Sequence, residues 1–456
     1  MEAAMIRADR LSFRYPNQSI EALSDIHFSV RQGEILLISG PTGCGKSTLA
    51  MALCGAIPHL IAGELSGSVM INEISSFDRP VHETARDLGM LLQDVTDQAF
   101  TDRVSDEIAF GLENFCIPQD QIERRISDAL ELVSACHLQL RSLSTLSSGE
   151  RQRIMLAALL ALDQPALVLD EPLAYLDTHS RHRLLDLLCR LAKRGKAILV
   201  FEHRRDIVLC TGCSELYLDH GRPTDPPAPR PIFQIHPSSA GAPRLILEDV
   251  TFRWDADTPP LFSKLSLLVR AGESTVLKGE NGSGKTTLLL MAMGLIRPDK
   301  GRILTCGIEV NPRSRAEVLK KAALVLQHPD HQLFLPTVLE EVCMQGIGAD
   351  SCAAELENMG LKGLQQRHPR SLSMGQKRRL TIASALAKRP ELILLDEPSV
   401  GQDDHSLSLI LKRLDQFVQD GGALLVTTHD ERVSRALGHQ ILQLSHGNIL
   451  IERQSM

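Results

Sequence analysis

Short runs of consecutive apolar residues mark the predicted core strands of this chain. Residues 166–169 and 197–201 are apolar throughout, which is typical of strands buried on both faces of a parallel sheet. Residues 11–15 and 26–30 alternate instead, which indicates strands with one exposed face. From Val104 to Leu162 the spacing is helical. Strands that alternate with helices predict a parallel α/β core, with the helical stretch as an inserted subdomain.

The same succession of patterns occurs twice. Residues 392–395 and 423–426 repeat the two buried runs, and Asp170 and Asp396, which follow the first run of each half, are 226 positions apart. Each copy is about 220 residues long, the size of one domain. Proline is dense between Arg222 and Pro243, and proline disfavours both helices and central strands. We therefore predict two domains, residues 1–225 and 244–456, joined by an extended linker at residues 226–243.

A glycine-rich loop joins the apolar run at residues 35–38 to a predicted helix at residues 49–53. Such a loop brings backbone N–H groups up to phosphate oxygens, and the helix N-terminus adds partial positive charge. Lys46 can reach the β- and γ-phosphates, and the Ser47 hydroxyl can ligate Mg²⁺. The loop recurs in the second half. The two predicted phosphate-binding loops are Gly40, Pro41, Thr42, Gly43, Cys44, Gly45, Lys46, Ser47 and Thr48, and Gly279, Glu280, Asn281, Gly282, Ser283, Gly284, Lys285, Thr286 and Thr287.

An acidic pair follows the buried strand of each half. The pairs are Asp170 with Glu171, and Asp396 with Glu397. Folds of this class bind ligands at the carboxyl ends of parallel strands. The aspartates suit Mg²⁺, held directly or through water, and the glutamates suit a base that orients an attacking water. A simple turn would explain one such pair, but its repetition beside a phosphate-binding loop favours a catalytic site.

A second glycine motif, Ser-x-Gly, opens a helical stretch with basic residues in each half. It contains Ser147 and Gly149 in the first half, and Ser373 and Gly375 in the second. A turn of this kind can bind another anion. With five motifs repeated in order, nearly the whole chain resembles ATP-binding cassette (ABC) ATPases that have two fused nucleotide-binding domains. The resemblance implies an α/β fold of two tandem P-loop NTPase domains, each with a mainly parallel core sheet, an antiparallel β subdomain and an inserted helical subdomain.

The resemblance further implies that the two halves pair head to tail, so that each ATP lies between the loop of one half and the Ser-x-Gly motif of the other. The first site would contain Lys46, Ser47, Gln93, Asp170, Glu171 and His203 together with Ser373 and Gly375. The second would contain Lys285, Thr286, Gln327, Asp396, Glu397 and His429 together with Ser147 and Gly149. In that family the glutamine senses Mg²⁺ and the attacking water, and the histidine contacts the γ-phosphate. ATP and Mg²⁺ are the implied cofactors.

Two aromatic residues and three substitutions complete the comparison with the family pattern. Tyr15 and Trp254 correspond to the residue that stacks on adenine, since a flat π-face can pack on the base. Ser148 and Met374 replace the middle glycine of the Ser-x-Gly motif, and Glu150 replaces its glutamine. The change at Met374 is the larger one. It predicts that the first site is the slower of the two.

The residues after Gln93 and Gln327 indicate which kind of ABC ATPase this chain resembles. Gln98 aligns with Gln332, and Phe100 with Phe334. These segments resemble the short helix of energy-coupling-factor (ECF) importers, the prokaryotic uptake systems for vitamins and metals, although the first segment lacks the proline. In ECF importers this helix receives a coupling helix of the transmembrane protein. The resemblance implies an ATPase that powers uptake through a transmembrane coupling subunit and a substrate-binding membrane subunit, at the cytoplasmic face of a prokaryotic cell membrane.

Two other classes of ATPase stay open. Twin-cassette ATPases of sugar importers resemble this chain, but their second site usually lacks the catalytic residues that are kept here. Soluble twin cassettes act on ribosomes or damaged DNA, but carry a long charged linker, zinc modules or coiled coils. The linker of this chain is short and rich in proline, so we expect no nucleic-acid partner.

The composition agrees with a cytosolic protein. The net charge of −7 and pI near 6.2 give no sign of a nucleic-acid-binding surface. No apolar run approaches the ~20 residues that a membrane-spanning helix needs. The first ten residues carry charges and lack a signal core, and ten scattered cysteines suit a reducing compartment. We therefore expect any membrane role to come through a partner.

Overall fold

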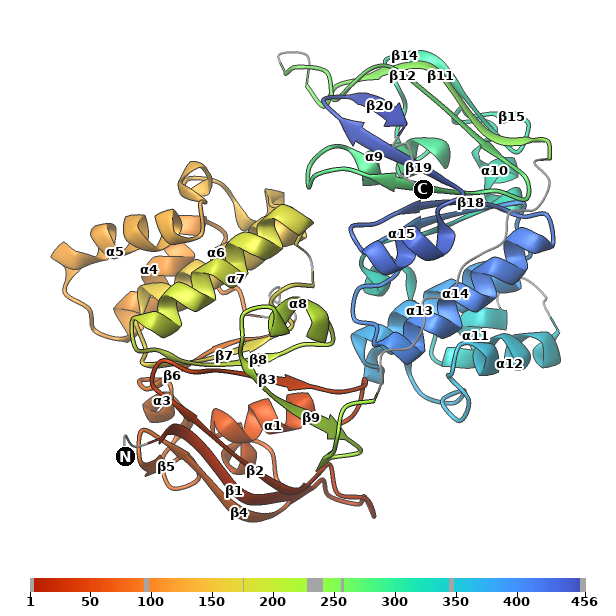
Figure 1. Ribbon diagram of the computed structural model, residues 1–456. Helices are drawn as coiled ribbons and strands as arrows, with labels where there is room; N and C mark the ends of the chain where they lie inside the picture. Colours follow the sequence, from red (N-terminus) through yellow and green to blue (C-terminus); the bar gives the residue numbers. More distant parts are fainter. Residues whose placement is uncertain are drawn as a thin grey trace. The chain divides into compact units, whose positions relative to one another are not determined.

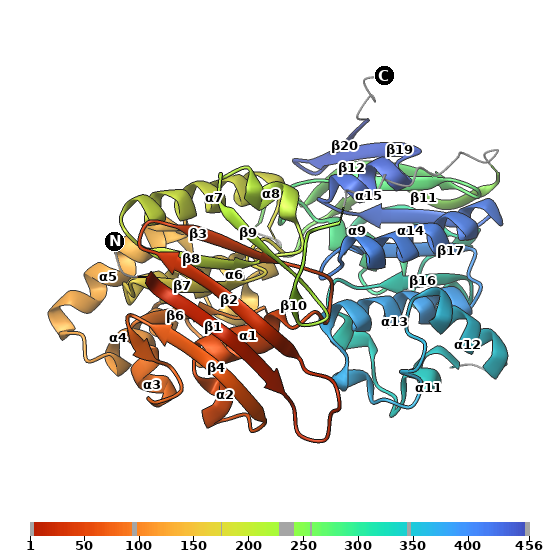
Figure 2. The same cartoon turned by 60° about the horizontal axis from the view of Figure 1, so that its bottom comes forward.

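The computed structural model describes residues 4–93, 98–174, 176–227, 241–255, 258–343 and 348–451. The chain divides into two compact units, Met1–Ala228 and Pro229–Met456, and each is described by itself (Figures 1 and 2). Most of the predicted linker, residues 228–240, lies outside the described residues.

Two sheets form the frame of the first unit. The antiparallel sheet has the strands β1 (Ala4–Arg14), β2 (Leu23–Arg31), β4 (Glu64–Ile71) and β5 (Ile74–Ser75), in the order β2-β1-β4-β5. The core sheet has β3 (Ile35–Ser39), β6 (Leu88–Leu91), β7 (Ala166–Asp170), β8 (Ala197–Phe201), β9 (Ser214–Asp219) and β10 (Arg222–Pro223), in the order β10-β9-β3-β8-β7-β6. All of its neighbouring strands run parallel except β10, which pairs antiparallel with β9.

The helices of the first unit cover both faces of the core sheet. They are α1 (Lys46–Leu53), α2 (Ala56–His59), α3 (Val81–Thr84), α4 (Val104–Asn114), α5 (Gln119–Leu132), α6 (Ser148–Ala161), α7 (Thr178–Lys193) and α8 (Arg205–Leu209), with short 3₁₀ turns at Cys136–Leu138 and Leu143–Thr145. Helix α1 contacts both β4 and β7, so it lies between the two sheets. Helices α4 to α7 lie on the opposite side of the core sheet (Figure 1).

The core strands build two hydrophobic cores because successive side chains point to opposite faces. In β7, Val168 packs with α1 and the antiparallel sheet, whereas Leu167 and Leu169 pack with α4 to α7. In β3, Ile38 belongs to the first core and Leu37 to the second. Burial on both faces explains why these strands read as continuous apolar runs.

The second unit repeats this architecture. Its antiparallel sheet has β11 (Pro243–Phe252), β12 (Phe262–Arg270), β14 (Lys300–Thr305) and β15 (Ile308–Glu309), in the order β12-β11-β14-β15. Its core sheet has β13 (Ser274–Lys278), β16 (Ala322–Val325), β17 (Leu392–Asp396), β18 (Ala423–Thr427), β19 (Gln440–Ser445) and β20 (Asn448–Ile451), in the order β16-β17-β18-β13-β19-β20. Its helices are α9 (Lys285–Ala292), α10 (Arg315–Lys321), α11 (Val338–Cys343), α12 (Ala349–Asn358), α13 (Met374–Ala387), α14 (Asp404–Gln419) and α15 (Glu431–Leu437), with 3₁₀ turns at Pro329–Gln332 and Pro369–Ser371.

The α/β fold and the inserted helices are confirmed, with differences at the ends of elements. The helical stretch from Val104 is interrupted after Asn114, because Pro118 cannot continue a helix, and α5 begins directly after it. Helix α1 begins at Lys46, three positions before the predicted start. Strand β6 ends at Leu91. Within the residues that the structure describes, none of the helices is long and apolar enough to cross a membrane.

Candidate active site

The two phosphate-binding loops have the geometry that the sequence predicts. Gly45 precedes α1 with φ of 106°, and Gly284 precedes α9 with φ of 100°. This left-handed region is readily available only to glycine, and a Cβ on Gly45 would lie 2.5 Å from the carbonyl oxygen of Ala22. The turn lets each helix begin at its lysine, which leaves the first helical N–H groups directed at the loop. An anion can bind there.

The loop lysines are buried and fold back over their own loops. Nζ of Lys46 donates to the carbonyl oxygens of Gly40, at 2.8 Å, and Pro41, at 3.1 Å. Nζ of Lys285 donates to the carbonyl oxygens of Gly279, at 2.6 Å, and Glu280, at 3.0 Å. Each cation is thereby held inside the concave loop, where phosphate oxygens are expected.

The predicted metal ligands meet at the carboxyl end of the core strands in the second unit. Oγ1 of Thr286 donates to Oδ2 of Asp396 at 2.6 Å, and Oγ1 of Thr427 donates to Oδ1 of the same carboxylate. A hydroxyl beside a carboxylate fits the oxygen ligands that Mg²⁺ prefers. In the first unit, burial and the charge of Glu171 raise the pKa of Asp170 to about 7, although Lys46 and His203 act in the opposite direction.

Both predicted catalytic glutamates have left-handed backbone conformations, which the sequence did not reveal. The φ angle is 48° at Glu171 and 50° at Glu397. The N–H of Glu171 donates to the carbonyl oxygen of Phe201, and that of Glu397 to Thr427, both at 2.9 Å. Such a conformation is uncommon for a residue with a side chain and is concentrated at functional sites. It turns the glutamate away from the line of the strand that precedes it.

In the first unit, His203 connects the glutamate with the phosphate-binding loop. Its Nε2 lies 2.8 Å from Oε1 of Glu171, and its Nδ1 lies 3.0 Å from the carbonyl oxygen of Gly40. Burial opposes the ionisation of Glu171, but the charge and hydrogen bond of His203, the charge of Lys46 and a hydrogen bond from Gln93 hold its pKa below the ordinary value. The structure thus brings three predicted site residues, His203, Lys46 and Gln93, around the Glu171 carboxylate.

The corresponding histidine of the second unit has different partners. Nε2 of His429 lies 3.1 Å from Nζ of Lys285 and 3.6 Å from Oε1 of Glu397. A lysine ammonium can only donate, so this ring nitrogen accepts. The carbonyl group of Gln327, the second predicted sensor, accepts a hydrogen bond from the buried Arg378. The two units therefore share these residues, but the histidine makes different hydrogen bonds in each.

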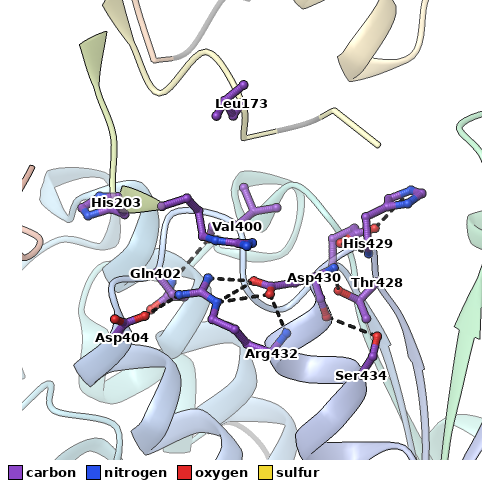
Figure 3. A network of polar contacts seen from close by, with 12 residues as sticks. Leu173, His203, Val400, Gln402, Asp404, Thr428, His429, Asp430, Arg432 and Ser434 are labelled. Carbon is purple, nitrogen blue, oxygen red and sulfur yellow. Dashed lines mark hydrogen bonds and ion pairs between the residues drawn. The ribbon is translucent and has the colours of Figure 1, made fainter. Parts of the chain in front are cut away.

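A polar network that sequence reasoning missed anchors the segment after His429 (Figure 3). Asp430 caps the N-terminus of α15, and the Arg432 guanidinium binds both Asp430, at 2.7 Å, and Asp404, at 2.5 Å. Burial disfavours the charge on Arg432, but these two carboxylates raise its pKa. The signal in the sequence is a charge exchange: the matching positions of the first half carry Arg204 and Asp206.

Each Ser-x-Gly motif forms a helix N-terminus. Ser147 and Ser373 are the N-caps of α6 and α13, and each forms a capping box with the residue three positions later. A Cβ on Gly375 would lie 2.3 Å from the carbonyl oxygen of Gly401, so glycine is required there. Both the N–H and the hydroxyl of Ser147 donate to the Glu150 carboxylate, at 2.9 and 2.8 Å. A negative charge therefore lies where this motif would receive a phosphate. Which loop each motif faces stays a prediction.

The two aromatic candidates differ in exposure. The Tyr15 hydroxyl lies 3.1 Å from Oγ1 of Thr48, and its half-buried ring packs edge-on against Phe13. Trp254 packs edge-on against Phe252, and 61% of its surface is exposed. An edge-on neighbour leaves a ring face open for an adenine base. Stacking at either residue stays a prediction.

The segments after Gln93 and Gln327 share one design. Gln98 accepts from the N–H of Leu92, and Gln332 from that of Leu326, both at 2.8 Å. The buried carboxylates of Glu107 and Glu341 accept hydrogen bonds from backbone N–H groups of these segments, including those of Phe100 and Phe334. In the second unit the segment forms the 3₁₀ turn Pro329–Gln332, which agrees with the predicted short helix. Residues 94–97 of the first segment, which include Asp94 and Asp97, lie outside the described residues.

Comparisons with known proteins assign both halves of the chain to one family. The sequence profile of the ABC transporter family matches residues 23–174 and 262–400. A putative ABC transporter ATP-binding protein of Methanosarcina mazei is 33% identical and aligns with 98% of this chain and 94% of its own. A Bacillus subtilis protein named putative HMP/thiamine import ATP-binding protein YkoD is 30% identical, over 96% of this chain and 90% of its own. The solved structure of CbiO1 from Clostridium perfringens, part of the ABC transporter complex CbiONQ, has 27% identity and a TM-score of 0.45, over 49% of this chain and 88% of its own.

Proposed function

The chain belongs to the ABC transporter family as an ATP-binding protein with two cassettes, an ATPase that drives transport, and on this premise we propose that it powers uptake by an ECF-type importer. ABC ATP-binding proteins generally work with transmembrane subunits. We assign residues 1–225 and 244–456 to the two nucleotide-binding domains and residues 226–243 to the linker. The partners would be a transmembrane coupling subunit and a substrate-binding membrane subunit, with this chain at the cytoplasmic face of a prokaryotic membrane.

The proposed chemistry follows from the contacts within each unit. Lys46 and Lys285 would bind the β- and γ-phosphates, and Glu171 and Glu397 would orient the attacking water. Asp170 with Ser47, and Asp396 with Thr286, would hold Mg²⁺, which neutralises charge on the phosphates when it is bound. Both glutamates have the same left-handed conformation directly after the matching buried strand, which supports a shared role.

The observation that carries the importer proposal is a pair of exposed phenylalanines. Phe100 is 74% exposed and Phe334 is 76% exposed, although both belong to segments that a buried glutamate holds in place. Aromatic residues that stay exposed on a fixed backbone favour a protein partner. Both follow the glutamines that would sense Mg²⁺ and water. A partner that contacts Phe100 or Phe334 would therefore respond to whether nucleotide is bound.

An ion pair in the second unit extends this connection. Nζ of Lys377, on α13 just after Ser373, lies 2.7 Å from Oδ1 of Asp330 in the segment after Gln327. The segment is thus tied to the helix that opens at the Ser-x-Gly motif. Because Asp330 already has a cation within the chain, it is a poor candidate for receiving a basic residue of the partner. The phenylalanines are the better target for mutation.

The substrate class rests on a single name. The B. subtilis relative is named for import of HMP and thiamine. This agrees with a vitamin or other micronutrient as cargo, and the proposal goes no further, because the substrate would be recognised by the membrane subunits and not by this chain.

The test of the proposal is a double variant, Phe100→Ala with Phe334→Ala. We expect it to lose co-purification with transmembrane subunits from detergent-solubilised membranes of the source cells, while the isolated chain keeps its ATPase rate. The control is Leu60→Ala with Leu295→Ala, which removes one exposed apolar side chain from each unit elsewhere. Retained membrane partners in the double variant, or purification of the chain with ribosomes, would contradict the proposal.

A further inference from the structure

The first unit contains a cavity that the proposed transport cycle does not use. Its volume is about 310 Å³, and it is lined by the end of α5, by α6 and α7, and by residues that follow β7. Cavities that bind small molecules begin at ~300 Å³. This one is therefore at the small end of the range for ligand sites.

In the second unit, several positions that correspond to the cavity region of the first carry polar side chains that form hydrogen bonds. Arg413 on α14 pairs with Glu355 on α12, with Nε 2.9 Å from Oε1. The guanidinium of Arg379 donates to Oε1 of Gln402 at 3.0 Å. Arg378, which is 1% exposed, donates to the carbonyl oxygens of Leu326 and Gln327.

At four of these five positions the first unit has shorter or apolar residues, whereas Arg379 corresponds to Arg153. Counting back 226 positions, Arg413 and Glu355 become Leu187 and Ala129, Gln402 becomes Leu176, and Arg378 becomes Gln152. Leu187, Leu176 and Gln152 all line the cavity. The cavity thus lies where the residue types of the first unit differ from those of the second.

Apart from one amide, the buried side chains that line the cavity are apolar. Gln152 is 3% exposed, and its Nε2 donates to the carbonyl oxygen of Glu171 at 3.2 Å. Its Oε1 is buried and has no hydrogen-bond partner within the described part of the chain. An unpaired buried acceptor is energetically unfavourable. A donor on a bound molecule would remove this penalty, whereas Leu156 and Leu187 offer only apolar contact.

The rim of the cavity is positively charged. Arg153, Arg183 and Arg190 line it, against a single acidic residue, Asp186. Arg183 and Arg190 are exposed and seven positions apart on α7, so they lie on the same face of the helix. The second unit has Leu409 and Gln416 at these two positions. The positive rim therefore occurs together with the cavity.

From these features we propose that the cavity binds a small amphipathic anion. Its apolar body occupies the leucine-lined interior, and its carboxylate or phosphate lies among the three arginines. The site is distinct from the phosphate-binding loops and exists in the first unit independently of the membrane partners.

The test uses octanoate as the probe and isothermal titration calorimetry on the purified full chain. We expect binding with one octanoate per chain, and weaker binding of the neutral octanamide. Arg183→Glu with Arg190→Glu should weaken octanoate binding by about tenfold or more. The matched control, Lys193→Glu with Arg194→Glu, makes the same charge change at the C-terminal end and C-cap of α7, outside the rim, and should leave binding unchanged.

A second variant fills the cavity with the side chains of the second unit. Ala129→Glu with Leu187→Arg recreates the pair formed by Glu355 and Arg413, and should abolish octanoate binding. The proposal is wrong if octanoate does not bind, if octanamide binds as tightly, or if either the rim variant or the filled variant binds like the unchanged chain. The rim variant alters only exposed residues, so it decides the question even if the filled variant fails to fold.

Discussion

Nε2 of His203 lies 2.8 Å from Oε1 of Glu171, whereas the matching atoms of His429 and Glu397 are 3.6 Å apart. The shorter distance places the histidine on the carboxylate, and the longer one leaves it with Lys285 at 3.1 Å. Two sites with the same residues thus start from different hydrogen-bond arrangements. This difference concerns the groups that would contact the attacking water and the γ-phosphate.

Replacing both glutamates should separate binding from hydrolysis. We expect Glu171→Gln with Glu397→Gln to keep ATP binding and to slow phosphate release by about a hundredfold or more, since a positioned general base contributes 10²–10⁴ to the rate. Glutamine keeps the size of the side chain and a hydrogen-bond acceptor but is not a base. The matched control is Glu123→Gln on the exposed side of α5, which should hydrolyse ATP normally. Phosphate release near the normal rate in the double variant would remove the assignment.

Combined variants should show which loop shares an ATP with Ser373. If the halves pair head to tail, Lys46→Ala and Ser373→Ala damage the same site, so the double variant should be about as active as the worse single variant. Lys285→Ala with Ser373→Ala damages both sites and should lose nearly all ATPase activity. Steady-state phosphate release measures this. The opposite pattern, with the greater loss in the Lys46 combination, would contradict head-to-tail pairing.

Trp254 gives a direct signal for nucleotide at the second loop, because it is the one tryptophan of the chain and is 61% exposed. We expect ATP to quench its fluorescence through stacking on the base. Lys285→Ala should abolish the change, and Lys46→Ala should preserve it. Trp254→Ala should weaken ATP binding at this loop by about 1 kcal/mol, roughly fivefold. A titration in which saturating ATP leaves the fluorescence unchanged would rule out adenine stacking here.

Cys44, inside the first phosphate-binding loop, should resist alkylation. Burial raises the pKa of its thiol, although nearby Lys46 opposes this, and only the thiolate reacts. We expect iodoacetamide at pH 7 to modify the exposed Cys116, Cys136 and Cys210 at least about tenfold faster. A time course of peptide mass spectrometry measures the rates, with the denatured chain as the control in which all four react alike. Equal rates in the folded chain would show that the loop opens readily.

The sequence by itself determined the features that depend on neighbours along the chain. The continuous apolar runs at β7 and β17 predict buried strands, because a strand that is covered on both faces needs apolar side chains on both. The loops before Lys46 and Lys285 are recognisable because their glycines are needed for a turn of fixed length. Repetition of these motifs in one order was enough to indicate two cassettes.

Tertiary structure alone decided what depends on residues far apart in the chain. The left-handed conformations of Glu171 and Glu397 are held by carbonyl groups about thirty positions later, and no local pattern predicts such strain. The pairing of Lys377 with Asp330 connects two segments that the sequence presents separately. The cavity beside Gln152 is formed by residues of α5, α6 and α7 that lie far apart in the sequence. The physical reason is common to all three, because a side chain's partners are set by packing between distant elements, which residue spacing does not encode.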